Sequence, residues 1–66
     1  MAYTKLDKMW NEAVSNVGGR ENTMDNLKTI IKEFARLCRK DGTIKHQDGL
    51  NYAKETVNST VDFVKW

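Results

Sequence analysis

Residues 23–42, TMDNLKTIIKEFARLCRKDG, carry the clearest helical pattern in this chain of 66 residues. Apolar residues recur there in steps of three and four, which is the spacing of one face of an α-helix. Asn22 or Thr23 can cap the start, the basic residues of the last turn suit the negative end of the helix dipole, and Gly42 can end the helix. The pattern predicts a helix over residues 23–40. Its apolar stripe consists of Met24, Leu27, Ile30, Ile31, Phe34, Leu37 and Cys38.

Similar stripes predict one helix on each side of this segment. The N-terminal stripe runs from Tyr3 to Val17 and is followed by two glycines, which readily adopt the left-handed conformation that ends helices, so we expect a helix over residues 4–17. The C-terminal stripe predicts a third helix over residues 44–64, capped by Thr43 or Asp48. Residues 57–63 also alternate as a strand would, but the stripe is longer than the usual strand of about 4–8 residues. Its members are Leu50, Ala53, Val57, Val61 and Val64.

Three amphipathic helices joined by short loops predict an all-α fold, with residues 1–66 forming a single helical domain. Either a three-helix bundle or an orthogonal three-helix domain fits this order. A chain this short buries only about 60% of the surface that its unfolded form exposes, so we expect marginal stability. Cys38 is the only cysteine, which favours a reducing, cytoplasmic location. No apolar run approaches the roughly 18 residues of a membrane span, so no membrane partner is expected.

The charge of the chain is distributed unevenly. Residues 28–45 contain six basic and two acidic residues, a net charge of +4, whereas the parts before and after carry −1 each. At about 100° per residue, most of these cations fall on one edge of the predicted second helix, opposite its apolar stripe. A one-sided positive field favours anionic partners. We therefore predict that an acidic macromolecular surface is bound by Lys28, Lys32, Arg36, Arg39 and Lys40.

Aromatic residues accompany the apolar stripe of the predicted third helix. Tyr52, Phe63 and Trp66 fall beside that stripe and not on it. A helix in a three-helix domain buries one stripe against its neighbours, so the aromatic side is expected to be exposed. Exposed aromatic patches usually mark interfaces. We predict that these three residues contact another protein or a second copy of the chain, forming a dimer. Alternatively, the last turn of the predicted helix frays, and Phe63 or Trp66 folds back over the edge of the bundle.

The residue inventory argues against catalysis. One histidine, His46, and one cysteine cannot form a zinc site within one chain. No phosphate-binding loop or nucleophile elbow occurs in the sequence. We predict no enzymatic activity, cofactor, metal or small-molecule substrate. The expected role is that of a small binding protein: an adaptor, an inhibitor or a regulator.

Nucleic-acid binding is the alternative. A turn at Gly18 resembles that of helix-turn-helix DNA-binding proteins, and this placement would direct outward-facing polar residues at bases. However, a second glycine stands where the motif usually has an apolar anchor, and two acidic residues would face phosphates. The residues that would face the bases are Arg20, Asn22, Thr23 and Asn26.

Overall fold

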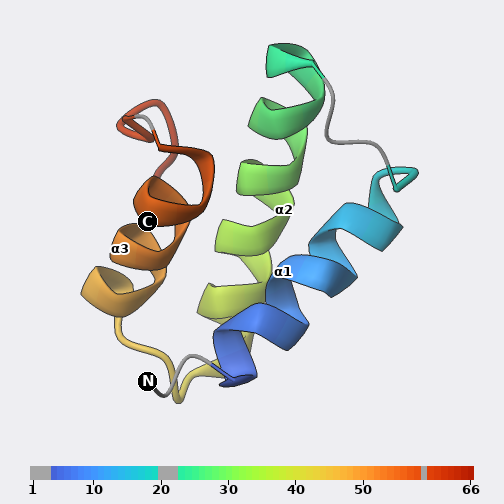
Figure 1. The fold of residues 1–66 in the computed structure, drawn as a ribbon. Helices are drawn as coiled ribbons and strands as arrows, with labels where there is room; N and C mark the ends of the chain where they lie inside the picture. Colours follow the sequence, from blue (N-terminus) through green and yellow to red (C-terminus); the bar gives the residue numbers. More distant parts are fainter. Residues whose placement is uncertain (1–3, 20–22, 59) are drawn as a thin grey trace.

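The computed structural model describes residues 4–19, 23–58 and 60–66, and their fold is built from three α-helices (Figure 1). Helix α1 spans Thr4–Asn16, α2 spans Met24–Asp41 and α3 spans His46–Val57. The central helix α2 contacts both of the others, with α1 on one side and α3 on the other. No strand occurs in these described ranges. The predicted all-α, three-helix fold is therefore confirmed.

The ends of α1 and α2 follow the local signals in the sequence. After α1, Gly19 has a positive φ of 75° and its N–H donates a 2.7 Å hydrogen bond to the carbonyl of Val14. Thr23 is extended before α2, and its hydroxyl accepts a 3.1 Å hydrogen bond from the backbone N–H of Asn26. Gly42 closes α2 with a φ of 76°. Because a left-handed backbone favours glycine, Gly19 and Gly42 end α1 and α2 close to where the sequence predicted.

The core forms around the apolar stripe of α2, and Phe34 lies at its centre with none of its surface exposed. The Phe34 ring meets Trp10 of α1 edge to face, with the ring centres 5.3 Å apart. It also lies 5.5 Å from the ring of Tyr52 on α3. Such aromatic pairs add to the stabilisation that burial of their surface provides. Two members of the predicted stripe near the start of α2 are outside the core: Met24, with 58% of its surface exposed, and the half-buried Leu27.

The predicted third helix is too long at its C-terminal end. It ends at Val57, and the next residue, Asn58, adopts a left-handed conformation with its N–H bonded to the carbonyl of Lys54. At the other end, the N-cap is Lys45. The predicted caps, Thr43 and Asp48, are therefore wrong. Of the chain after Asn58, residues 60–66 are described, and they contain no helix.

This early end has a physical reason in the packing of the C-terminal segment. Helix α3 buries Gly49 and Ala53, and its Leu50, Tyr52 and Val57 pack against the core while partly exposed. Residues 60–66 turn back toward the helices and bury Val61 and Val64 (Figure 1). The half-buried Trp66 follows and donates a 3.4 Å hydrogen bond from its indole N–H to the carbonyl of Val61. Folding back thus buries the apolar side chains of Val61 and Val64, which stabilises this arrangement.

Gly49 marks a close approach of α3 to its neighbours. A Cβ atom at this position would lie 3.2 Å from Sγ of Cys38 and 3.3 Å from Cζ3 of Trp66. We expect Gly49→Val to lower the free energy of unfolding by about 1–3 kcal/mol, the usual cost of overpacking. Thermal or urea denaturation measures this loss. The matched control is Glu55→Val at an exposed position of α3, and equal stability of the two variants would contradict the close packing at Gly49.

Candidate anion-binding face

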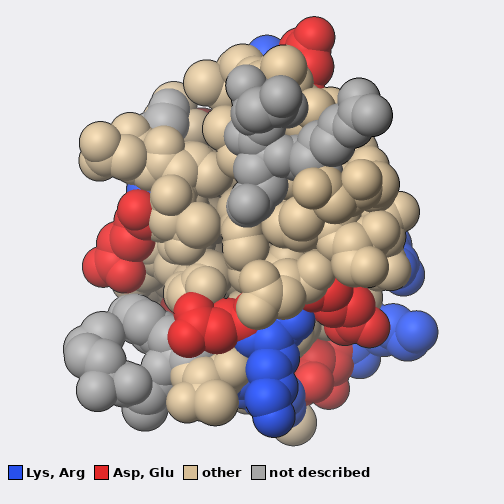
Figure 2. Space-filling model, turned by 45° about the vertical axis from the view of Figure 1, so that its right-hand side comes forward, with Lys and Arg blue, Asp and Glu red and all other residues tan. Residues whose placement is uncertain are grey.

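The basic row, by which we mean the five cations predicted to bind an acidic partner, is exposed along α2. The helix turns its buried stripe toward the core and leaves every one of these side chains at the surface. Figure 2 shows one face of the molecule, on which basic and acidic side chains lie next to one another near the lower edge and most other atoms are uncharged. The members of the basic row are Lys28, Lys32, Arg36, Arg39 and Lys40.

Among the described residues, Arg36 is the one member of the basic row that forms an ion pair. Its Nη2 lies 2.5 Å from Oε2 of Glu33, one helical turn away, and its Nε donates to Oε1 at 2.9 Å. Asn16 of α1 donates a further 3.0 Å hydrogen bond to Glu33. The hydrogen bond from Arg36 is the largest of the effects that lower the pKa of Glu33 to about 2. Arg36 is therefore less available to an outside partner than the other four cations.

The C-terminal segment contacts the basic row at two points. The ring of Phe63 has its centre 5.9 Å from Nζ of Lys28, which is within the range of a cation–π interaction. Near the other end of α2, Nη1 of Arg39 donates a hydrogen bond to the main-chain carbonyl of Lys65. These contacts place residues 63–65 along the edge of the basic row. No local signal in the sequence predicts either contact, because both join residues far apart in the chain.

The predicted aromatic face does not form as one helix face. Tyr52 lies on α3, but Phe63 and Trp66 follow the end of that helix. The Trp66 ring packs edge to face on Phe34, with the ring centres 6.0 Å apart. The half-buried Tyr52 donates its hydroxyl to Asp7, and burial, followed by this hydrogen bond, raises its pKa to about 12. Phe63 alone of the three is exposed, with 45% of its surface accessible. The prediction of a shared aromatic helix face is therefore wrong, and the alternative holds, because Trp66 folds back onto the core. Contact of these residues with a partner stays a prediction.

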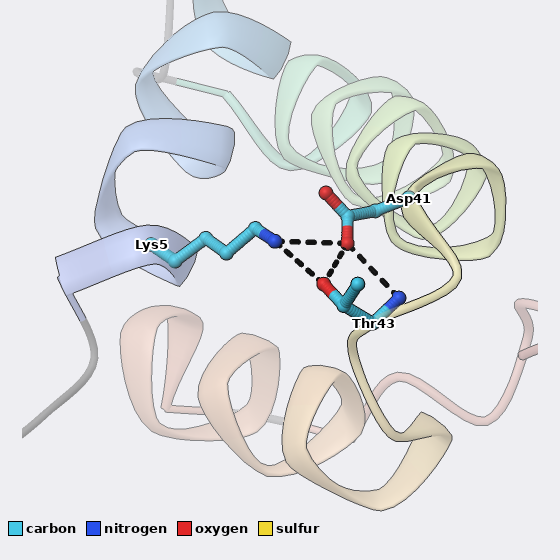
Figure 3. Close-up of polar contacts among 3 residues, drawn as sticks. All are labelled: Lys5, Asp41 and Thr43. Atoms are coloured by element: carbon cyan, nitrogen blue, oxygen red, sulfur yellow. Dashed lines mark hydrogen bonds and ion pairs between the residues drawn. The ribbon is translucent and has the colours of Figure 1, made fainter.

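A polar cluster ties the start of α1 to the loop between α2 and α3 (Figure 3). Oδ1 of Asp41 accepts hydrogen bonds from Nζ of Lys5 and from the backbone N–H of Thr43, each at 3.0 Å, and a third from the Thr43 hydroxyl. Nζ of Lys5 also donates to Oγ1 of Thr43 at 2.5 Å. The Thr43 hydroxyl and then Lys5 lower the pKa of Asp41 to about 2. Asp41 is thus held by its own loop and by α1.

Acid should weaken the fold through two carboxylates, Glu33 and Asp41. Each has a folded-state pKa of about 2, below its ordinary value of 4.5 or 3.8. Their stabilising contribution is therefore complete above the unfolded pKa and is lost as the pH falls toward about 2. We expect the melting temperature to drop across this range and to drop less in Asp41→Asn. If the melting temperature falls equally with pH in both proteins, the role of Asp41 is contradicted.

Cys38 and His46 are the single cysteine and the single histidine of the chain. Cys38 is buried, and burial raises the pKa of its thiol to about 11, which leaves little thiolate at neutral pH. It lines a small pocket with Arg39, His46 and Trp66. Within the described ranges, no group of three or more histidine, cysteine, aspartate and glutamate side chains is placed to hold a metal ion. Searched over the same residues, no helix has the length and apolar character needed to cross a bilayer.

The helix-turn-helix alternative rests partly on residues that the structure does not describe. Arg20 and Asn22, two of the four predicted base-reading residues, lie outside the described ranges. The Thr23 hydroxyl caps α2 through the backbone N–H of Asn26, so in this arrangement it is already bonded within the chain. Gly19 ends α1 in a left-handed conformation and brings no apolar side chain to the turn.

No protein-family model, curated protein or solved structure matches the chain.

Proposed function

We propose that this chain is a small binding protein, an adaptor, inhibitor or regulator, that docks on an acidic surface of another protein through the basic row of α2. The observation that carries this proposal is the exposure of all five cations, of which only Arg36 is ion-paired within the described residues. The others can meet carboxylates of a partner without first breaking an ion pair of the chain.

The helix makes the basic row suitable for recognition. From Lys28 to Arg39 the row extends over about 16 Å at a rise of about 1.5 Å per residue. The packing of α2 on the core holds the backbone of these residues in place, which reduces the entropy lost on binding. A positive edge also accelerates encounter with an acidic partner and disfavours basic ones. The row thus supplies both orientation and selectivity.

Nucleic acid is the competing partner, because the same cations would neutralise phosphates. Two acidic residues on α2 favour a protein partner instead. Asp25 lies in the first turn, one turn before Lys28, and Glu33 forms an ion pair with Arg36. A continuous phosphate backbone would pass close to these carboxylates. A folded protein presents carboxylates at separate positions and can avoid them.

The decisive variant reverses the charge of Lys32, an exposed member of the basic row. We expect Lys32→Glu to weaken partner capture about tenfold, which corresponds to about 1.4 kcal/mol of binding free energy. The control is Lys8→Glu, which changes the net charge equally at an exposed position of α1. Each protein is immobilised, and capture is compared in lysate with and without nuclease treatment. Equal capture by both variants would refute the role of the row, and capture that nuclease abolishes would identify nucleic acid as the partner.

A further inference from the structure

We infer that the basic row and the C-terminal segment form one docking surface, whose ligand is an acidic peptide segment carrying an apolar side chain. This inference rests on the proposed function and specifies the chemistry of the partner. The apolar side chain would pack against Met24 and Phe63, and the carboxylates would pair with the cations farther along α2.

Two exposed apolar side chains lie beside the same lysine. Met24 and Phe63 are the large hydrophobic residues that the described structure leaves exposed, at 58% and 45% of their surfaces. Met24 precedes Lys28 by one helical turn, a spacing that makes their side chains neighbours on the helix surface. The Phe63 ring lies 5.9 Å from Nζ of Lys28. Two residues far apart in the sequence thus form an apolar spot around Lys28.

Cations continue from this spot toward the other end of α2. Lys32 follows Lys28 by one turn and is exposed. Arg39 holds the main chain of Lys65 by a hydrogen bond, which places a further exposed cation at the end of the row. The C-terminal segment therefore adds one aromatic ring and one positive charge to a surface that α2 begins.

The chemistry of this surface fits an amphipathic acidic peptide. Methionine and aromatic side chains are enriched at protein interfaces, and methionine adapts its shape to different apolar groups. Asp25 precedes Lys28 by one helical turn, so its carboxylate disfavours a phosphate at this end of the row. The cationic end, with Lys32 and Lys65, suits the carboxylates of the ligand. A polyphosphate backbone has no apolar group to bring to the spot.

A second copy of the chain fits this surface less well. Self-association through the same face would bring two basic rows together, and like charges facing each other oppose binding. An acidic partner gains from the same charges. The charge of the surface therefore favours a ligand of different composition from this chain.

Fluorescence anisotropy with two labelled synthetic peptides tests the inference: one has glutamates flanking a central phenylalanine, and the other contains glutamate alone. We expect Phe63→Ser to weaken binding of the first peptide about fivefold or more and to leave binding of the second unchanged, because the substitution removes the aromatic anchor and leaves every charge of the basic row in place. Phe63→Leu, which keeps an apolar side chain, should retain most of the affinity. Lys32→Glu should weaken the binding of both peptides.

The outcomes separate this inference from the proposed function. If Phe63→Ser binds the first peptide as tightly as the unchanged protein while Lys32→Glu binds weakly, the composite surface is refuted and the basic row survives. If Lys32→Glu has no effect, or neither peptide binds, the proposed function fails as well. Displacement of the first peptide by oligothymidylate at lower concentration than by unlabelled peptide would overturn the peptide ligand in favour of nucleic acid. Circular dichroism of each variant checks that the substitution leaves the helix content unchanged.

Discussion

Removing residues 60–66 is expected to unfold most of the protein. The deletion takes away Val61 and Val64, which are buried, and Trp66, which packs on Phe34. Full burial of a valine stabilises by about 1.5–3 kcal/mol, and the indole contributes further. The combined loss is similar to the whole stability expected for this chain length, about 3–10 kcal/mol at about 0.05–0.15 kcal/mol per residue. Far-ultraviolet circular dichroism should show a large loss of helix in the shortened chain.

A matched pair of substitutions tests the same packing at full length. Val61→Ser places a polar hydroxyl at a position with no exposed surface, whereas Asp62→Ser changes the adjacent, exposed residue. We expect a clear drop in melting temperature for the first variant and almost none for the second. A shortened chain that keeps the helix content and cooperative melting of the intact protein would contradict the role of the segment.

The second large effect is expected at Phe34. Its side chain is completely buried, and its ring packs against Trp10, Tyr52 and Trp66, which come from α1, α3 and the C-terminal segment. Phe34→Ala should lower the free energy of unfolding by about 3–5 kcal/mol, because it removes apolar contact and leaves a cavity. Urea denaturation measures this change. In a domain of this size, the variant should be partly unfolded without denaturant.

Phe34→Leu provides the control, since it keeps most of the buried volume and tests how much the aromatic ring itself contributes. We expect its loss to be smaller than that of the alanine variant. A loss below about 1 kcal/mol for Phe34→Ala, typical of a surface site, would show that the three helices do not pack around this ring.

Local signals in the sequence were sufficient to predict α1 and α2. Thr23, the glycine pair after α1 and Gly42 act on their immediate neighbours, so their effects do not depend on the rest of the fold. The apolar stripe of α2 is regular enough to identify its buried side from periodicity alone. Met24 departs from the pattern because it lies in the first turn, where α2 is less covered by the other elements.

The end of α3 could not be predicted from periodicity, because Val57, Val61 and Val64 fit the helical stripe and are all partly or fully buried in the actual fold. What differs is the backbone between them. Asparagine is a common left-handed residue after a helix, so Asn58 followed by β-branched residues was the available signal. The position of Trp66 then depends on burial against Phe34, which is a tertiary effect.

The candidate site was likewise predicted in part from the sequence. Exposure of the basic row followed from the position of the apolar stripe, and the pairing of Arg36 with Glu33 uses a spacing that is visible in the sequence. The contacts of Lys28 with Phe63 and of Arg39 with Lys65 arise only when the C-terminal segment folds back. For this reason the sequence predicted two separate surfaces, whereas the structure brings Phe63 to the basic row.

The most direct test of the proposed docking face is a nuclear magnetic resonance titration of the isotope-labelled protein with poly-glutamate. We expect the signals of Lys28, Lys32 and Arg39, with those of residues 63–65, to shift first and most strongly. The signal of Lys8 on α1 should change little. Shifts of equal size on α1 and α2, or shifts centred on Lys5 and Lys8, would contradict a specific anion-binding face on α2.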